Sequence, residues 1–233
     1  MVTAVITLLG VGHVFDLNAQ VRREILRRGP AVVGLELDPR RFQALSHPER
    51  QGGGPVIYRL LAYFQQNLAE GFGGRAGDEM LAAAGAARDI GARLAFIDMD
   101  SSHLLQRLWG SLPFEERIKI LVAAVSGLFA RRTTVEKEIA RYEEDQGAYL
   151  GEFGRQFPTV KHVLIDERDE HMAVTLRQLV TEFGSVVAVI GDGHVDGIRA
   201  RLADLTPEVV RLKELRHDAP STAEFSFSVQ SRP

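Results

Sequence analysis

The sequence contains no cysteine, which excludes disulfides, thiolate metal ligands and a cysteine nucleophile. It also has no excess of either charge, since 28 Lys and Arg residues stand against 31 Asp and Glu residues and give a formal net charge of -3. A protein that binds nucleic acid through bulk positive charge needs a basic excess or a basic stripe. We therefore expect no nucleic-acid partner.

Long hydrophobic runs are also missing. The longest apolar run within a helical pattern covers residues 118–130, well short of the roughly 20 residues that a membrane-spanning helix needs. Residues 2–12 are apolar, but no Lys or Arg precedes them, so they do not resemble a signal peptide. We expect a cytoplasmic protein with no integral membrane segment, and membrane association through a partner stays open.

The pattern of the 233 residues predicts one α/β domain over 1–233, with a central, mostly parallel sheet and helices packed around it. The opening strand–helix–strand pattern predicts a parallel strand pair joined by a right-handed crossover. Asp16 is expected to cap the first helix and Gly29 to end it. Strands are predicted at 2–9, 31–37, 93–98, 186–190, 209–215 and, as an edge strand, 224–229. Helices are predicted at 17–28, 55–70, 78–90, 163–183 and 195–202.

Residues 101–157 carry almost no strand signal and predict a helical insertion. Residues 118–129 within it have more apolar surface than one exposed helix should show. We expect the insertion to form a lid over the site or an arm in a dimer interface, and so we expect a homodimer.

A short pattern occurs twice, each time after an apolar run. Gly10-Val11-Gly12-His13 follows the first predicted strand, and Gly191-Asp192-Gly193-His194 follows the strand at 186–190. Glycines in such turns allow positive φ and a close approach of backbone to ligand. Because open α/β sheets bind ligands beyond the carboxyl ends of their strands, both histidines are candidate ligands of one metal ion. Two alternatives stay open: local hydrogen bonding by each histidine, and metal-free phosphate binding by the glycine turns.

Charged residues near strand ends add candidates. Glu36 shares a strand face with Val32 and Gly34 in an apolar run, and a buried carboxylate is costly unless it pairs or binds a cation. A solvent-facing Glu36 is the alternative. Asp98 and Asp100 follow the predicted third strand and are given less weight. Arg168 lies among four acids at a helix start, where most of the acids suit the helix dipole but a guanidinium is suited to orienting a carboxylate.

Four motifs in this order make the chain resemble the TraB/PrgY family, over roughly residues 5–215. That family is similar to the TIKI proteases and, more remotely, to the erythromycin-esterase and ChaN-like proteins. The motifs are Gly10-x-x-His13, Gly34-Leu35-Glu36-Leu37-Asp38, Glu167-Arg168-Asp169 with Met172-Ala173, and Gly191-x-x-His194-Val195-x-Gly197-Ile198.

The resemblance implies an α/β core built of two related halves, with both Gly-x-x-His motifs, a Glu and an Arg gathered at one site. It also implies metal-dependent peptidase activity with manganese or cobalt, as in TIKI proteins, or a link to shutting down a peptide pheromone, as in PrgY-like members. Carried over residue by residue, His13 and His194 are the motif histidines, Glu36 is the acid and Arg168 is the motif arginine. Gly10, Gly12, Asp98, Asp100, Gly191 and Gly193 are assigned supporting or substrate-binding places.

The chain departs from the family pattern at three places. Val11 stands where relatives often have Thr, so a hydroxyl is lost there, and Met99 stands where an Arg between two Asp residues is expected. Both departures bear on substrate chemistry. Many members also carry a membrane-embedded C-terminal region that these 233 residues do not show, which bears on any membrane role.

Together these features predict a metal-dependent hydrolase that acts on peptides. His13 and His194 hold Mn²⁺ or Co²⁺, with Zn²⁺ as a further choice, and Glu36 is a third ligand or a general base. Arg168 steadies Glu36 or a developing oxyanion. No Gly-x-Ser-x-Gly elbow and no His-Glu-x-x-His helix occur in the sequence. The alternative is a protein that binds and sequesters a peptide or small ligand without efficient turnover. Haem binding through a tyrosine is a third option with little support.

Overall fold

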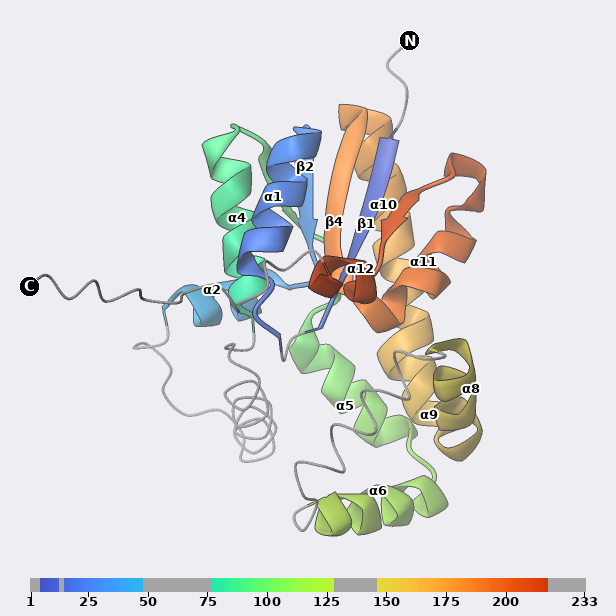
Figure 1. Cartoon of the computed structure of the whole chain (residues 1–233). Helices are drawn as coiled ribbons and strands as arrows, with labels where there is room; N and C mark the ends of the chain where they lie inside the picture. The colour runs from blue at the N-terminus through green and yellow to red at the C-terminus, as the bar shows by residue number, and fades with distance from the viewer. Residues whose placement is uncertain (1–4, 13–14, 48–76, 128–145, 218–233) are drawn as a thin grey trace, which may run out of the picture.

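The computed structural model describes residues 5–12, 15–47, 77–127 and 146–217 (Figure 1). Several predictions concern residues outside these ranges: the helix at 55–70, the edge strand at 224–229 and the position of His13. Within the described residues, no helix combines the length and the apolar character needed to cross a bilayer.

The described elements alternate between strands and helices near both ends of the described chain, and those between β3 and β4 are all helical. In order they are β1 (Val5–Val11), α1 (Asn18–Arg28), β2 (Val32–Leu35), α2 (Pro39–Ser46), α4 (Asp78–Asp89), β3 (Arg93–Phe96), α5 (Ser101–Ser111), α6 (Phe114–Gly127), α8 (Gln146–Gln156), α9 (Pro158–Lys161), the π-helix η2 (His162–Asp166), α10 (Glu167–Phe183), β4 (Ser185–Gly191), the 3₁₀ helix η3 (Asp192–His194), α11 (Val195–Arg201), the 3₁₀ helix η4 (Ala203–Leu205), β5 (Glu208–Val210) and α12 (Leu212–His217).

The five strands form one parallel sheet in the order β3-β2-β4-β1-β5. This confirms the predicted α/β class with a parallel sheet. The expectation that β1 and β2 pair directly is wrong, because β4 lies between them and pairs with both. Residues 186–190 of β4 are Val-Val-Ala-Val-Ile and are all buried, and such a continuous apolar run suits a strand covered on both faces.

Alternate side chains of each strand enter two separate cores. On one face, Leu9, Val33 and Val189 pack with helices α1, α4 and α12. On the other face, Val32 and Ala188 lie in the core that α10 and α11 cover. Each fully buried aliphatic side chain contributes about 1.5–3 kcal/mol, so this alternation fixes the register of the strands. The same alternation determines the face of the sheet on which the side chain of Glu36 lies.

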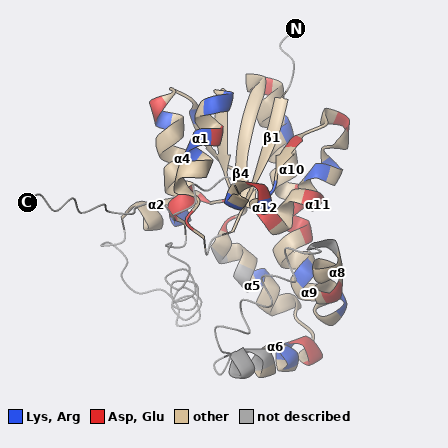
Figure 2. Ribbon diagram, in the orientation of Figure 1, with Lys and Arg blue, Asp and Glu red and all other residues tan. Residues whose placement is uncertain are grey.

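The helical insertion lies beyond the carboxyl ends of the strands, where α5, α6, α8 and α9 gather at the lower end of the molecule in Figure 1. Leu104 and Leu108 of α5, with Leu112 just after it, form a third small core with Val160 and Val163. Lys and Arg are interspersed with Asp and Glu along the helices (Figure 2). The described parts of the insertion, 101–127 and 146–157, are therefore largely helical as predicted, and they lie at the end of the sheet where α/β proteins bind ligands.

Two local predictions were wrong. Leu17 rather than Asp16 is the N-cap residue of α1, although Gly29 ends that helix in the left-handed conformation as expected. The predicted strand at 209–215 ends at Val210, and α12 follows it. The side chain of Glu214 accepts a hydrogen bond from the Arg211 amide (3.1 Å), as in a capping box, and starts a helix within an apolar run that had suggested a strand.

Candidate functional site

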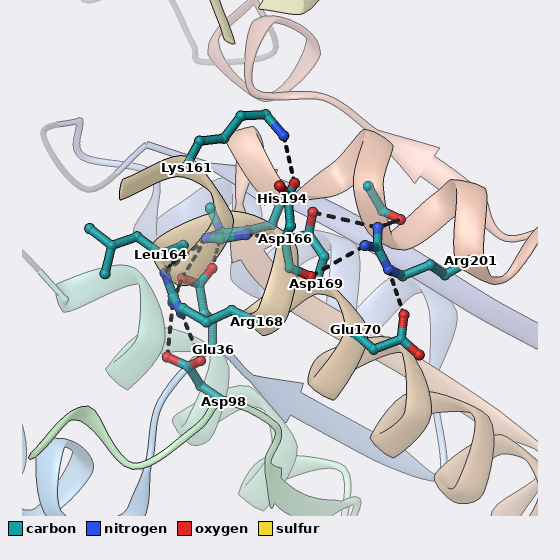
Figure 3. Close-up of polar contacts among 12 residues, drawn as sticks. Glu36, Asp98, Lys161, Leu164, Asp166, Arg168, Asp169, Glu170, His194 and Arg201 are labelled. Atoms are coloured by element: carbon teal, nitrogen blue, oxygen red, sulfur yellow. Dashed lines mark hydrogen bonds and ion pairs between the residues drawn. The ribbon is translucent and has the colours of Figure 1, made fainter. Parts of the chain in front are cut away.

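Four side chains that the sequence analysis singled out meet at the carboxyl ends of three strands (Figure 3). Glu36 follows β2, Asp98 follows β3, and His194 ends η3, directly after β4. Arg168 lies in the first turn of α10, which covers that face of the sheet. Segments far apart in the chain therefore deliver two carboxylates, an imidazole and a guanidinium to one place.

Glu36 points inward, so the solvent-facing alternative is wrong. Its side chain is only 5% exposed. One carboxylate oxygen, Oε2, accepts a hydrogen bond from the Gly191 amide at 2.5 Å, and the other, Oε1, accepts one from Nη2 of Arg168. As the face pattern predicted, a side chain at Gly34 would meet Leu176 of α10, on the same face. The strand register thus directs the carboxylate toward α10.

Asp98 lies deeper than its sequence context suggested. Its side chain is 1% exposed. Arg168 donates to both of its oxygens, Nε to Oδ1 and Nη2 to Oδ2, at 2.9 Å each. Arg41 of α2 adds a third bond to Oδ2 at 3.1 Å. Asp100, given equal weight in the sequence, is instead a half-exposed residue 3.8 Å from Arg40, so the structure does not bring it into the site.

Arg168 connects the other groups of the site. Besides Asp98 and Glu36, its Nη1 donates to the Leu164 carbonyl at 3.1 Å and lies 3.0 Å from Nε2 of His194. Burial acts to lower the pKa of Arg168, but the charges of Glu36 and Asp98 and their hydrogen bonds outweigh it and raise that pKa further above its ordinary value. The guanidinium is therefore permanently charged.

His194 is held from both sides. Its Nδ1 lies 2.6 Å from Oδ1 of Asp169, and its Nε2 lies 3.4 Å from Oε1 of Glu36. Because Arg168 has only hydrogens to offer, Nε2 accepts from it, and Nδ1 then carries the proton and donates to Asp169. In this tautomer the single lone pair of Nε2 is directed at Nη1 of Arg168, and Oε1 of Glu36 lies beside it.

Asp169 is a site residue that the sequence analysis attributed to the helix dipole. Its side chain is 3% exposed. Burial raises its pKa above the ordinary value, although the hydrogen bond with His194 and the charges of His194 and Arg201 act in the opposite direction. Arg41 was also missed. The only sequence signal for Asp169 was its place inside the Glu167-Arg168-Asp169 motif.

None of the four glycines in the two repeated turns has the positive φ that the sequence analysis allowed for, and Gly10 and Gly12 instead make room for neighbouring side chains. Gly10, Gly12, Gly191 and Gly193 are not among the described glycines with positive φ. A Cβ at Gly10 would collide with Oδ1 of Asp192, and one at Gly12 would lie 3.0 Å from Leu212 and Phe15. Gly191 supplies its amide to Glu36, and Gly193 lies in η3.

The first turn begins beside the second, because Val11 of β1 pairs with Gly191 of β4. His13 follows Val11 by two residues but lies outside the described ranges. The prediction that His13 and His194 share one ion therefore stays a prediction.

The described side chains would supply some of the ligands of a metal ion, but not a full set. No group of three or more His, Asp and Glu side chains suited to an ion occurs within the ranges that the structure describes. However, Nε2 of His194 and Oε1 of Glu36 are 3.4 Å apart, close to the separation of about 3.3–3.4 Å for two ligands of a tetrahedral ion with bonds of about 2.0–2.1 Å. Asp169 contacts the other ring nitrogen, Nδ1, as carboxylates that hydrogen-bond to metal-bound histidines do. Imidazole and carboxylate are also suitable donors, so the pair fits two places of a divalent site.

The arrangement combines one imidazole, three buried carboxylates and one permanent cation. It is able to bind a cation between His194 and Glu36, to accept a proton at Glu36, and to place positive charge from Arg168 beside a substrate oxygen. Perturbed, buried charges gathered at the ligand-binding end of a sheet favour a functional site over a structural ion pair.

Comparison with known proteins agrees with the motifs. The chain is 32% identical to an uncharacterised protein of Methanocaldococcus jannaschii, in an alignment that covers 96% of this chain and 62% of that relative. The chain thus spans less than two thirds of the length of this curated relative. The family model described as the TraB/PrgY/gumN family matches residues 2–208. The chain therefore belongs to the TraB/PrgY/gumN family.

Proposed function

We propose that this chain is a metal-dependent hydrolase that cleaves peptides. The observation that carries the proposal is the separation of 3.4 Å between Nε2 of His194 and Oε1 of Glu36, beyond the carboxyl ends of β2 and β4. His13 would complete the ligand set with these two residues. A bound Mn²⁺, Co²⁺ or Zn²⁺ ion would lower the pKa of a coordinated water and polarise the scissile carbonyl.

The chain's own residues supply orientation and charge. The Gly191 amide holds Oε2 of Glu36, which leaves Oε1 toward His194 as a ligand or as the acceptor of a proton from water. In peptide hydrolysis that proton passes on to the leaving amine as the C–N bond breaks. Arg168 keeps Glu36 in place and offers its charge to the oxyanion that forms on the carbonyl.

One observation favours the alternative function, a protein that sequesters a peptide or small ligand without turnover. Nη1 of Arg168 lies 3.0 Å from Nε2 of His194, so the guanidinium already uses the lone pair that a metal ion would need. In that case Arg168, rather than an ion, is the cation that recognises a carbonyl or carboxylate of the ligand.

The two functions differ in whether peptide is consumed. A mixture of unlabelled peptides is incubated with protein that has been stripped by a chelator and then reloaded with Mn²⁺, Co²⁺ or Zn²⁺, and the products are identified by mass spectrometry. The hydrolase produces cleaved peptides only after reloading, and His194→Ala abolishes them. His171→Ala, which changes an exposed histidine on α10, is the matched control. Stoichiometric retention of intact peptide would support the sequestering function instead.

A homodimer and a cytoplasmic location remain predictions. Support for the homodimer comes from an exposed apolar row on α6, where Phe114 is 76%, Ile118 45% and Val122 59% exposed. These residues are four apart and therefore share one helix face. Molar mass from light scattering, compared between the native chain and Ile118→Glu, tests the homodimer: one subunit mass in both samples would contradict it.

A further inference from the structure

Asp169 has no task in the proposed reaction, yet it is built into the site. Its carboxylate is 3% exposed, and Oδ1 lies 2.6 Å from Nδ1 of His194. The two residues come from different elements, the first turn of α10 and the end of η3 (Figure 3). A carboxylate in this position costs desolvation free energy, so its contact with the imidazole has to compensate for it.

Gly197 makes room for this carboxylate. A Cβ built on Gly197 would lie 2.7 Å from Cγ of Asp169 and still closer to Oδ2. Any other residue at 197 would therefore push Asp169 away from α11. Gly197 belongs to the motif Gly191-x-x-His194-Val195-x-Gly197-Ile198, and this contact gives a physical reason for a glycine three residues after the histidine.

Arg201 links α10 and α11 by hydrogen bonds close to the contact between Gly197 and Asp169. It donates from Nη1 to the Gly197 carbonyl at 3.0 Å and from Nε to Glu170 at 2.8 Å. Its Nη2 also donates to the Asp166 carbonyl at 3.3 Å. The bonds join α11 to the start of α10, so the distance between Gly197 and Asp169 is held from outside as well.

We propose that Asp169 is a positioning residue that fixes His194 as the Nδ1–H tautomer, with Nε2 unprotonated beside Arg168, and that Gly197 provides the space this requires. Without an acceptor at Asp169, a hydrogen on Nδ1 loses its partner, and only the donation from Arg168 still favours that tautomer. A hydrogen on Nε2 would instead face Oε1 of Glu36, 3.4 Å away, so the two tautomers would compete. The contribution of this arrangement to metal binding rests on the proposed function. The assignment of the His194 tautomer does not depend on that function.

The test reads the tautomer directly. Long-range ¹H–¹⁵N spectra of metal-free protein labelled at histidine, in alkaline buffer where the ring is neutral, distinguish Nδ1–H from Nε2–H. The His194 signals are assigned by their loss in His194→Ala. The native chain is expected to show Nδ1–H, whereas Asp169→Ala shifts His194 to Nε2–H or to a mixture. Asp169→Asn, which keeps an acceptor oxygen, retains part of the native signal.

A second variant keeps the test informative if Asp169→Ala does not fold. Gly197→Ala leaves Asp169 in the chain but displaces it, so the same change of tautomer is expected. Gly85→Ala is the matched control, because that glycine also lies in a helix and has nothing within 4 Å of an added Cβ. Zn²⁺ affinity, measured by calorimetry, should fall about 10–100-fold in Asp169→Ala and Gly197→Ala and stay unchanged in Gly85→Ala.

The outcomes separate this inference from the proposed function. If the native His194 carries its hydrogen on Nε2, or if folded Asp169→Ala and Gly197→Ala both leave Nδ1–H in place, the positioning role is wrong. If the native tautomer is Nδ1–H and responds to both variants but no Zn²⁺ binds, the positioning role stands and the metal-dependent function fails.

Discussion

Arg168 and Asp98 form a two-point ion pair, with Nε and Nη2 of the arginine each 2.9 Å from a different oxygen of the aspartate. The planar guanidinium matches the carboxylate in this geometry, which a lysine ammonium is unable to reproduce. Both side chains are buried, with 13% of Arg168 and 1% of Asp98 exposed. Removing one partner of such a pair leaves an uncompensated buried charge.

Asp98→Asn should therefore destabilise the fold by about 3–5 kcal/mol. Asp100→Asn is the natural control, because Asp100 also follows β3 but is 38% exposed and lies 3.8 Å from Arg40. It should cost at most about 1 kcal/mol. Urea unfolding of the three proteins measures the difference. Equal losses in the two variants would show that Asp98 is not the buried anchor described above.

Arg168→Met should destabilise the fold more than Arg168→Lys, because it leaves Glu36 and Asp98 buried without a cation. The double variant Arg168→Met with Asp98→Asn should recover part of that loss. The interaction free energy in this double-mutant cycle should be about 1–3 kcal/mol. Additive effects of the two substitutions would mean that the pair is not energetically coupled.

Gly10→Ala should destabilise the fold by about 1–3 kcal/mol, since the added Cβ overlaps Oδ1 of Asp192. That oxygen accepts the Leu212 amide at 2.9 Å and so holds α12 against the sheet. Gly110→Ala on α5, where an added Cβ meets nothing within 4 Å, is the control and should be stabilising by up to about 1 kcal/mol. Thermal unfolding followed by circular dichroism compares them, and similar midpoints in both variants would contradict the account of Gly10.

The ionisation of Glu24 should make the free energy of unfolding depend on pH in the acidic range. Burial acts to raise its pKa, but hydrogen bonds and charges from Arg27 and Arg28 outweigh it, so the pKa in the folded protein lies below its ordinary value. The unfolded state then takes up the proton first as the pH falls. The stabilisation is present above the unfolded pKa of about 4.3 and is lost as the pH falls through the lower folded pKa.

Urea titrations across this acidic range test the linkage. Glu24→Gln should flatten the fall in unfolding free energy, whereas Glu182→Gln, at an exposed position on α10, controls for the loss of one negative charge. Parallel curves for the native chain and Glu24→Gln would show that Glu24 does not contribute.

The sequence alone was enough to predict most of the sheet and four of the six described side chains of the site, Glu36, Asp98, Arg168 and His194. The apolar runs of β1 and β4 and the alternation that turns Glu36 inward are local patterns, and local patterns follow from backbone geometry. Asp169 was missed because an acid in the first turn of a helix has a sufficient local explanation in the helix dipole. Its true partner, His194, lies 25 residues away.

Arg41 and the position of β4 were missed for a similar reason. The bond from Arg41 to Asp98 spans 57 residues, and nothing near either residue indicates it. The insertion of β4 between β1 and β2 depends on which strand gains most from burial on both faces, and a strand-by-strand pattern does not specify neighbours. Contacts between distant segments therefore had to come from the structure.

The central claim is that His194, Glu36 and His13 hold one divalent ion. The most direct measurement is elemental mass spectrometry of protein purified without a chelator or a histidine tag, together with His13→Ala, His194→Ala and the control His171→Ala. The account predicts close to one Mn, Co or Zn per native chain and per His171→Ala chain, and loss of the metal in both other variants. Absence of metal from every sample, even after each ion has been added back, would contradict it.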